Sequence, residues 1–103
     1  MSEYVKLTTI SELPPAGEAR EFELNGKMIC VANTESGYAA MDNVCVHRGG
    51  PLGQGMVDGN KIICPWHGWT FDVNTGASTH DASARVKTFP IKVEGEEVYI
   101  AVE

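Results

Sequence analysis

The sequence predicts an all-β protein with an antiparallel, β-sandwich-like framework. Short segments rich in Val, Ile, Tyr and Phe recur along the chain and are separated by Gly, Asn, Asp and Pro, the pattern of strands joined by turns. No apolar stripe of helical period extends beyond a turn or two. With 103 residues, 43% of them hydrophobic, the chain has room for one compact core. We therefore expect a single domain over residues 1–103.

The strands and turns can be assigned in order along the chain. Asn25-Gly26 and Asp58-Gly59 predict two-residue hairpin turns, because both residue pairs tolerate positive φ. Gly95 predicts a third turn, and residues 11–17 predict an irregular connection with one turn of helix. The predicted strands cover residues 4–8, 20–24, 27–32, 38–41, 61–63, 70–73, 86–93 and 98–102.

The middle of the chain differs from its two flanks. Residues 43–55 contain four glycines and a proline with little alternation of apolar and polar side chains, and residues 65–69 form a second irregular stretch. We expect residues 43–84 to be a small subdomain inserted into a framework made by residues 1–42 and 85–103.

Composition restricts the partners and the compartment. Fourteen acidic against eight basic residues give a net charge of −6, which argues against a nucleic-acid or anionic-membrane surface and suits a basic partner. Three widely spaced cysteines do not make a disulfide framework. The N-terminus has no basic start followed by an apolar run, and no stretch of 18 apolar residues occurs. We expect a soluble cytoplasmic protein.

Two irregular segments each carry one cysteine followed by one histidine: Cys45 and His47 in the first, Cys64 and His67 in the second. Two thiolates and two imidazoles suit a 2Fe-2S cluster in which one iron has two histidine ligands. They also suit structural zinc. Zinc fingers, however, usually place both cysteines before both histidines and put the histidines on a helix, so the alternating order here favours the iron–sulfur cluster.

These motifs resemble those of the Rieske ferredoxins, whose ligands lie in C-x-H and C-x-x-H. The flanks in residues 45–52 and 64–72 also resemble the family, as do Thr75-Gly76 and residues 89–91, so the resemblance covers nearly the whole chain. It implies the Rieske iron-sulfur fold, with residues 43–84 as the cluster-binding subdomain. It also implies one 2Fe-2S cluster held by the four residues.

The resemblance also implies the class of Rieske protein. Respiratory-chain members carry an extra cysteine in each loop, joined as a disulfide, and a serine and a tyrosine that donate hydrogen bonds to cluster sulfurs. Here Gly50 and Trp66 occupy the cysteine positions, and Trp69 and Phe71 occupy the serine and tyrosine positions. With fewer hydrogen bonds to the cluster sulfurs, the reduced state is stabilised less, which predicts a low reduction potential.

We expect a carrier of single electrons, not an enzyme. The large oxygenases of the superfamily add a mononuclear iron held by two histidines and a carboxylate, and only His80 remains here beyond the two ligand histidines. The resemblance implies transfer from an NAD(P)H-dependent flavin reductase to a terminal, aromatic-ring-hydroxylating oxygenase. Two alternatives stay open: the small Rieske-like subunit of an assimilatory NAD(P)H nitrite reductase, and a structural-metal binding or redox-sensing module.

The remaining residues have simpler expected roles. Cys30, in an apolar segment, is expected to be a small buried hydrophobe. His80 is expected in an exposed loop. Trp66 and Trp69 are expected to limit water at the cluster. The two ligand histidines are expected to lie outermost and to form the electron exit.

Overall fold

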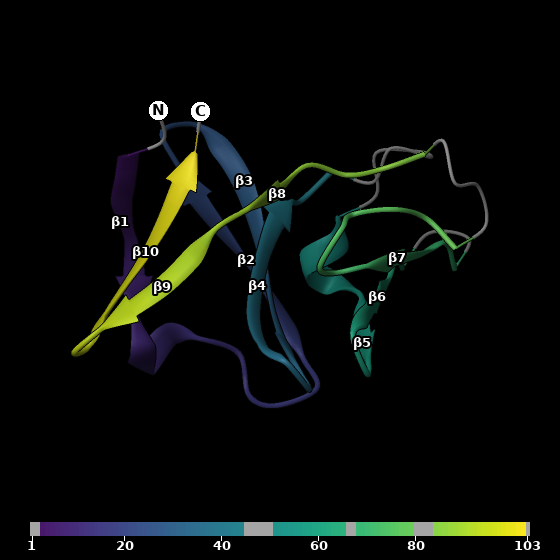
Figure 1. The fold of residues 1–103 in the computed structure, drawn as a ribbon, viewed down its shortest axis with the longest axis horizontal. Helices are drawn as coiled ribbons and strands as arrows, with labels where there is room; N and C mark the ends of the chain where they lie inside the picture. Colours follow the sequence, from purple (N-terminus) through teal and green to yellow (C-terminus); the bar gives the residue numbers. More distant parts are fainter. Residues whose placement is uncertain (1–2, 45–50, 66–67, 80–83, 103) are drawn as a thin grey trace.

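The computed structural model describes residues 3–44, 51–65, 68–79 and 84–102. These residues form three antiparallel sheets (Figure 1). The first is β1-β10-β9, made by Glu3–Thr9, Glu97–Val102 and Ile91–Glu94. The second is β2-β3-β4-β8, made by Ala19–Leu24, Lys27–Thr34, Gly37–Asp42 and Thr88–Phe89. The third is β5-β6-β7, made by Met56–Asp58, Lys61–Ile63 and Thr70–Asp72. The predicted all-β class is confirmed.

The third sheet stands beside the other two (Figure 1). The chain leaves the second sheet at the end of β4, forms β5, β6 and β7, and returns to the second sheet as β8. All three strands of the third sheet fall within the segment that the sequence predicts to be an inserted subdomain. Its limits at residues 43 and 84 stay a prediction. Among the residues described, no helix is long and apolar enough to cross a bilayer.

The hairpin turns follow the sequence with one correction. Asn25 and Gly26 join β2 to β3 with φ of 52° and 82°, the type I′ conformation that was predicted. The next turn was predicted at Asp58-Gly59, but Asp58 pairs with Lys61, so the loop is Gly59-Asn60. Only Gly59 of this pair has positive φ, at 62°, as a type II′ turn requires. The prediction was one residue early because it assumed a type I′ turn.

Two strand predictions were also wrong. The strand β5, Met56–Asp58, was missed because Val57 is its only β-branched residue. Residues 86–93 were predicted as one strand, but Pro90 separates β8 from β9. Proline has no N–H to donate to a ladder, and the two strands join different sheets. The irregular connection contains the short 3-10 helix η1, Ile10–Glu12.

Strand β3 is buried on both faces and supports two cores. Ile29 and Val31 face one core, whereas Cys30 and Ala32 face the other, because successive strand residues point to opposite faces. The framework core contains Leu13, Ile29, Val31, Ala40, Phe89, Val98 and Ile100. The site-side core contains Cys30, Ala32, Met41, Leu52, Ile62, Cys64, Phe71, Val73 and Val86. The site-side core attaches the third sheet to the second.

Gly76 is a point of close backbone approach beneath the third sheet. Its φ is +81°, and an added Cβ would overlap the carbonyl of Val86 and lie 3.2 Å from Cγ2 of Thr88. Gly17 provides a matched control, because its φ is +83° but a Cβ there would meet nothing within 4 Å. Gly17→Ala should cost about 1–2 kcal/mol for the left-handed backbone alone.

Gly76→Ala should add about 1–3 kcal/mol of overpacking to that cost. Urea unfolding followed by circular dichroism measures both variants. Equal unfolding midpoints for the two would show that the approach of Gly76 to Val86 is not a packing constraint.

Candidate metal centre

Cys64 is the one predicted ligand among the described residues. It follows directly after β6, where the sulfur-bearing side chain is 1% exposed and belongs to the site-side core. The Cys64 N–H donates to the carbonyl of Trp69 at 2.7 Å, which closes the base of the second ligand loop. Cys45, His47 and His67 lie outside the described residues.

The first ligand loop is also closed at its base. Val44 and Pro51, on either side of residues 45–50, form an antiparallel bridge. One residue further out on each side, the Leu52 N–H donates to the Asn43 carbonyl at 2.8 Å. The short 3-10 helix η2, Leu52–Gln54, begins there. Paired backbone thus flanks residues 45–50 on both sides.

A third segment is attached to the second loop. Phe71 of β7 bridges Ser78, and the Thr79 N–H donates to the Thr70 carbonyl at 2.9 Å. The Ser78 N–H donates to the Ala84 carbonyl at 2.9 Å. The stretch that contains His80 thus starts and ends beside the strand that follows the second ligand motif. His80 itself lies outside the described residues.

Aromatic side chains follow Cys64 in the loop and in β7. Phe71 is fully buried in the site-side core with Cys64. Trp69 is half-buried and packs against that core, with its ring 6.4 Å from the ring of Phe71 between centroids. The role of Trp69 in limiting water at the cluster stays a prediction. Trp66 lies outside the described residues.

Cys30 is buried as predicted. It is fully inaccessible and lies in the same core as Cys64. Burial, and secondarily the charge of Glu21, raises its pKa. A thiol held protonated in this way is a poor nucleophile and a poor metal ligand. The structure thus separates a structural cysteine from the candidate ligand.

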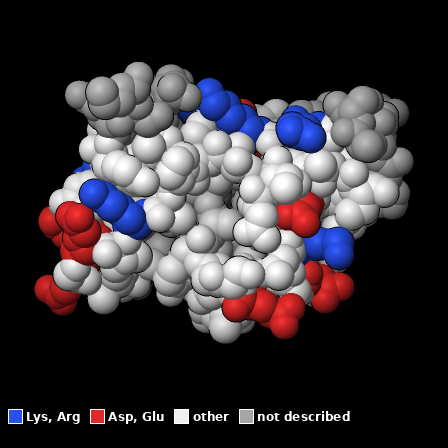
Figure 2. Space-filling view, in the orientation of Figure 1, with Lys and Arg blue, Asp and Glu red and all other residues white. Residues whose placement is uncertain are grey.

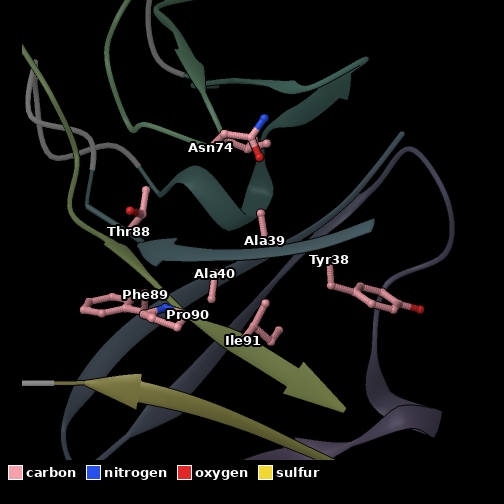
Figure 3. A pocket seen from close by; sticks show the side chains of 9 residues that line it. Tyr38, Ala39, Ala40, Asn74, Thr88, Phe89, Pro90 and Ile91 are labelled. Atoms are coloured by element: carbon pink, nitrogen blue, oxygen red, sulfur yellow. The ribbon is translucent and has the colours of Figure 1, made fainter. Parts of the chain in front are cut away.

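Charge and surface shape do not by themselves mark a docking site. Most acidic side chains visible in Figure 2 lie along the left and lower edges of this face. A hollow of about 300 Å³ lies between β4, the β8–β9 junction and the turn after β7, with Tyr38, Asn74 and Pro90 in its lining (Figure 3). Cys64 does not line it.

Comparisons with known proteins agree with this geometry. The family profile of the Rieske [2Fe-2S] domain matches residues 3–90. The ferredoxin component of the naphthalene 1,2-dioxygenase system of Pseudomonas aeruginosa is 34% identical over 87 residues, 84% of each chain. The chain belongs to the Rieske 2Fe-2S family.

Solved structures show the same relationship. The ferredoxin of carbazole 1,9a-dioxygenase from Nocardioides aromaticivorans IC177 is 29% identical with a TM-score of 0.85, over 97% of this chain and 98% of that one. A carbazole 1,9a-dioxygenase ferredoxin solved in complex with its oxygenase is also 29% identical, with a TM-score of 0.81 over 95% and 92%. A putative nitrite reductase small subunit, 18% identical with a TM-score of 0.83 over 97% and 99%, shares the fold.

The cofactor is therefore a Rieske-type 2Fe-2S cluster. The described residues fit it, because a buried thiol follows β6 and the two ligand loops are closed by backbone pairs at their bases. Sulfur donors suit iron–sulfur clusters.

Replacing each of the two described cysteines in turn distinguishes a cluster ligand from a residue that only packs in the core. Cys64→Ser should remove the low-average-g electron paramagnetic resonance signal of the reduced protein and the bound iron, because the sulfur ligand is lost. Cys30→Ser should keep both and lower the free energy of unfolding by about 1–3 kcal/mol, since a hydroxyl replaces a buried apolar group. A Cys64→Ser protein with full iron content and an unchanged signal would contradict the ligand assignment.

Proposed function

We propose that this protein is a Rieske 2Fe-2S ferredoxin that takes single electrons from an NAD(P)H-dependent flavin reductase and gives them to a terminal, aromatic-ring-hydroxylating oxygenase. The observation that carries the proposal is the match to dioxygenase ferredoxins over nearly their whole length and nearly the whole of this chain. One such relative was solved bound to its oxygenase. The chain acts as a carrier in the cytoplasm, and the substrate chemistry belongs to its partners.

The proposed ligands are Cys45, His47, Cys64 and His67. The two cysteines would hold one iron and the two histidines the other, with each loop supplying one residue of each type. The buried position of Cys64 supports its inner place. Residues 43–84 form the cluster-binding subdomain in this proposal.

Mechanistically, the cluster supplies a site that gains and loses one electron. The chain would hold it through the four proposed ligands, the site-side core would limit water beside Cys64, and His47 and His67 would provide the electron exit toward a docked partner. Phe71 and Trp69 form apolar surface beside Cys64. Low polarity around a cluster tunes its potential.

We further propose a potential near the lower end of the Rieske range, which spans roughly −150 to +300 mV. Phe71 has no hydroxyl to donate, although it is buried in the same core as Cys64. The hydroxyl of its neighbour Thr70 donates to the carbonyl of Gly68 at 3.3 Å. These contacts support a cluster with few hydrogen bonds to its sulfurs.

Restoring a hydroxyl should raise the potential. Phe71→Tyr should shift the midpoint upward by roughly 20–65 mV, the one-electron equivalent of a hydrogen bond of about 0.5–1.5 kcal/mol that favours the reduced state. Phe89→Tyr, the same change in the framework core, should leave it unchanged. Potentiometric titration measures both, and equal shifts would count against the role assigned to position 71.

Electron transfer tests the function directly. The purified protein should be reduced by NADH through a flavin reductase of a dioxygenase system, and it should then support substrate hydroxylation by the oxygenase of that system. Cys64→Ser should abolish turnover and Cys30→Ser should retain it. If the protein supports turnover by none of the oxygenases tested and co-purifies with a sirohaem protein, it would instead be a nitrite reductase subunit. A protein that no reductase reduces would indicate a sensing or structural module.

A further inference from the structure

Asn43, two residues before the first predicted ligand, is a hub of four hydrogen bonds. Only 4% of it is exposed. Its N–H donates to the Met28 carbonyl at 3.2 Å, and its carbonyl accepts from Leu52 at 2.8 Å. Its side-chain Oδ1 accepts the Gly53 N–H at 2.7 Å, and Nδ2 donates to Oε2 of Glu21 at 2.7 Å. The hub links strands β2 and β3 to the helix η2 that follows the loop.

Glu21 binds both sides of the first ligand loop. While Oε2 accepts from Asn43 before the loop, Oε1 accepts from Nε2 of Gln54 after it, at 3.0 Å. Each carboxylate oxygen is thus used by a different side of the loop. Hydrogen bonds to a charged acceptor are roughly twice as strong as neutral ones, so one side chain of β2 holds both sides.

Close packing at Gly53 also holds Glu21 against the backbone of η2. A Cβ at Gly53 would overlap the Glu21 side chain and lie 2.8 Å from Oδ1 of Asn43. The backbone of η2 therefore rests directly on Glu21. The Glu21 side chain and η2 are thus closely packed at this point.

The charge of Glu21 also lies close to the site-side core. Glu21 is half-buried and pairs in register with Cys30, and its charge contributes to the raised pKa of that thiol. Cys30 shares its core with Cys64. The ion pairs formed among the described residues join Lys6 to Glu97, Lys27 to Asp42 and Lys92 to Glu94. The carboxylate of Glu21 is in none of them, so its negative charge is not neutralised by a described cation.

We propose that Glu21 is a positioning residue for the cluster, which fixes the first ligand loop through Asn43 and Gln54 and places a negative charge that opposes reduction. The proposal rests on the ligand assignment above but not on any partner. Adding an electron beside a fixed negative charge is unfavourable, so this charge lowers the potential independently of the missing hydroxyl at Phe71.

The test compares Glu21→Gln with Glu23→Gln in the purified, cluster-loaded protein. Glu23 is the matched control, because it lies on the same strand and is exposed. Glu21→Gln removes the charge and keeps the shape, but its Nε2 cannot accept, so one of the two hydrogen bonds from Asn43 and Gln54 is lost. It should raise the equilibrium constant for reduction at least twofold, equivalent to about 18 mV for one electron at 59 mV per tenfold. Glu23→Gln should change it less. Equal shifts for the two variants would overturn the electrostatic role.

Two further variants test the positioning role. Hydrogen exchange followed by mass spectrometry should show amides of residues 52–54 exchanging at least tenfold faster in Glu21→Ala, and severalfold faster in Gln54→Ala, which keeps the charge. The rate of iron loss to a chelator should also increase more in Glu21→Ala than in Gln54→Ala. Wild-type exchange rates of these amides in Gln54→Ala, and in Glu21→Ala if that variant folds, would overturn the positioning role. These measurements need no reductase or oxygenase, so they are independent of the proposed carrier function.

Discussion

The rest of the structure depends on the double burial of strand β3. Alternate side chains of this strand enter the framework core on one face and the site-side core on the other. A slip of one residue in its pairing would exchange Ile29 and Val31 with Cys30 and Ala32, and so misfit both cores at once. The pairing of β2, β3 and β4 is therefore strongly specified. That rigid sheet is the base to which the cluster-binding segment is attached.

The ligand loops depend on pairs of backbone contacts, not on regular structure of their own. The bridge between Val44 and Pro51, and the bond from Cys64 to Trp69, close the two loops directly beneath the ligand positions. These contacts join residues at the two ends of each ligand loop, so the described part of the chain anchors both loops.

Members of one family can keep the fold and differ in potential, because a residue near the cluster can keep its packing and change its charge or hydrogen bonding. Phe71 fills the site-side core as a tyrosine ring would, yet it supplies no hydroxyl. Glu21 occupies an ordinary strand position, yet its carboxylate reaches across to Asn43 and Gln54. Small changes at such positions alter the charge and hydrogen bonding near the cluster and leave the packing intact.

By itself, the sequence determined the all-β class and the turn at Asn25-Gly26, and it predicts the ligand types, because these depend on local propensity and on the chemistry of neighbouring residues. Only the tertiary structure decided that Pro90 divides one predicted strand between two sheets, and that Glu21 contacts Asn43 and Gln54, 22 and 33 residues away. A contact between residues so far apart leaves no periodic or spacing signal in the chain. It exists only because the burial of β3 on both faces brings β2 against the start of the inserted segment.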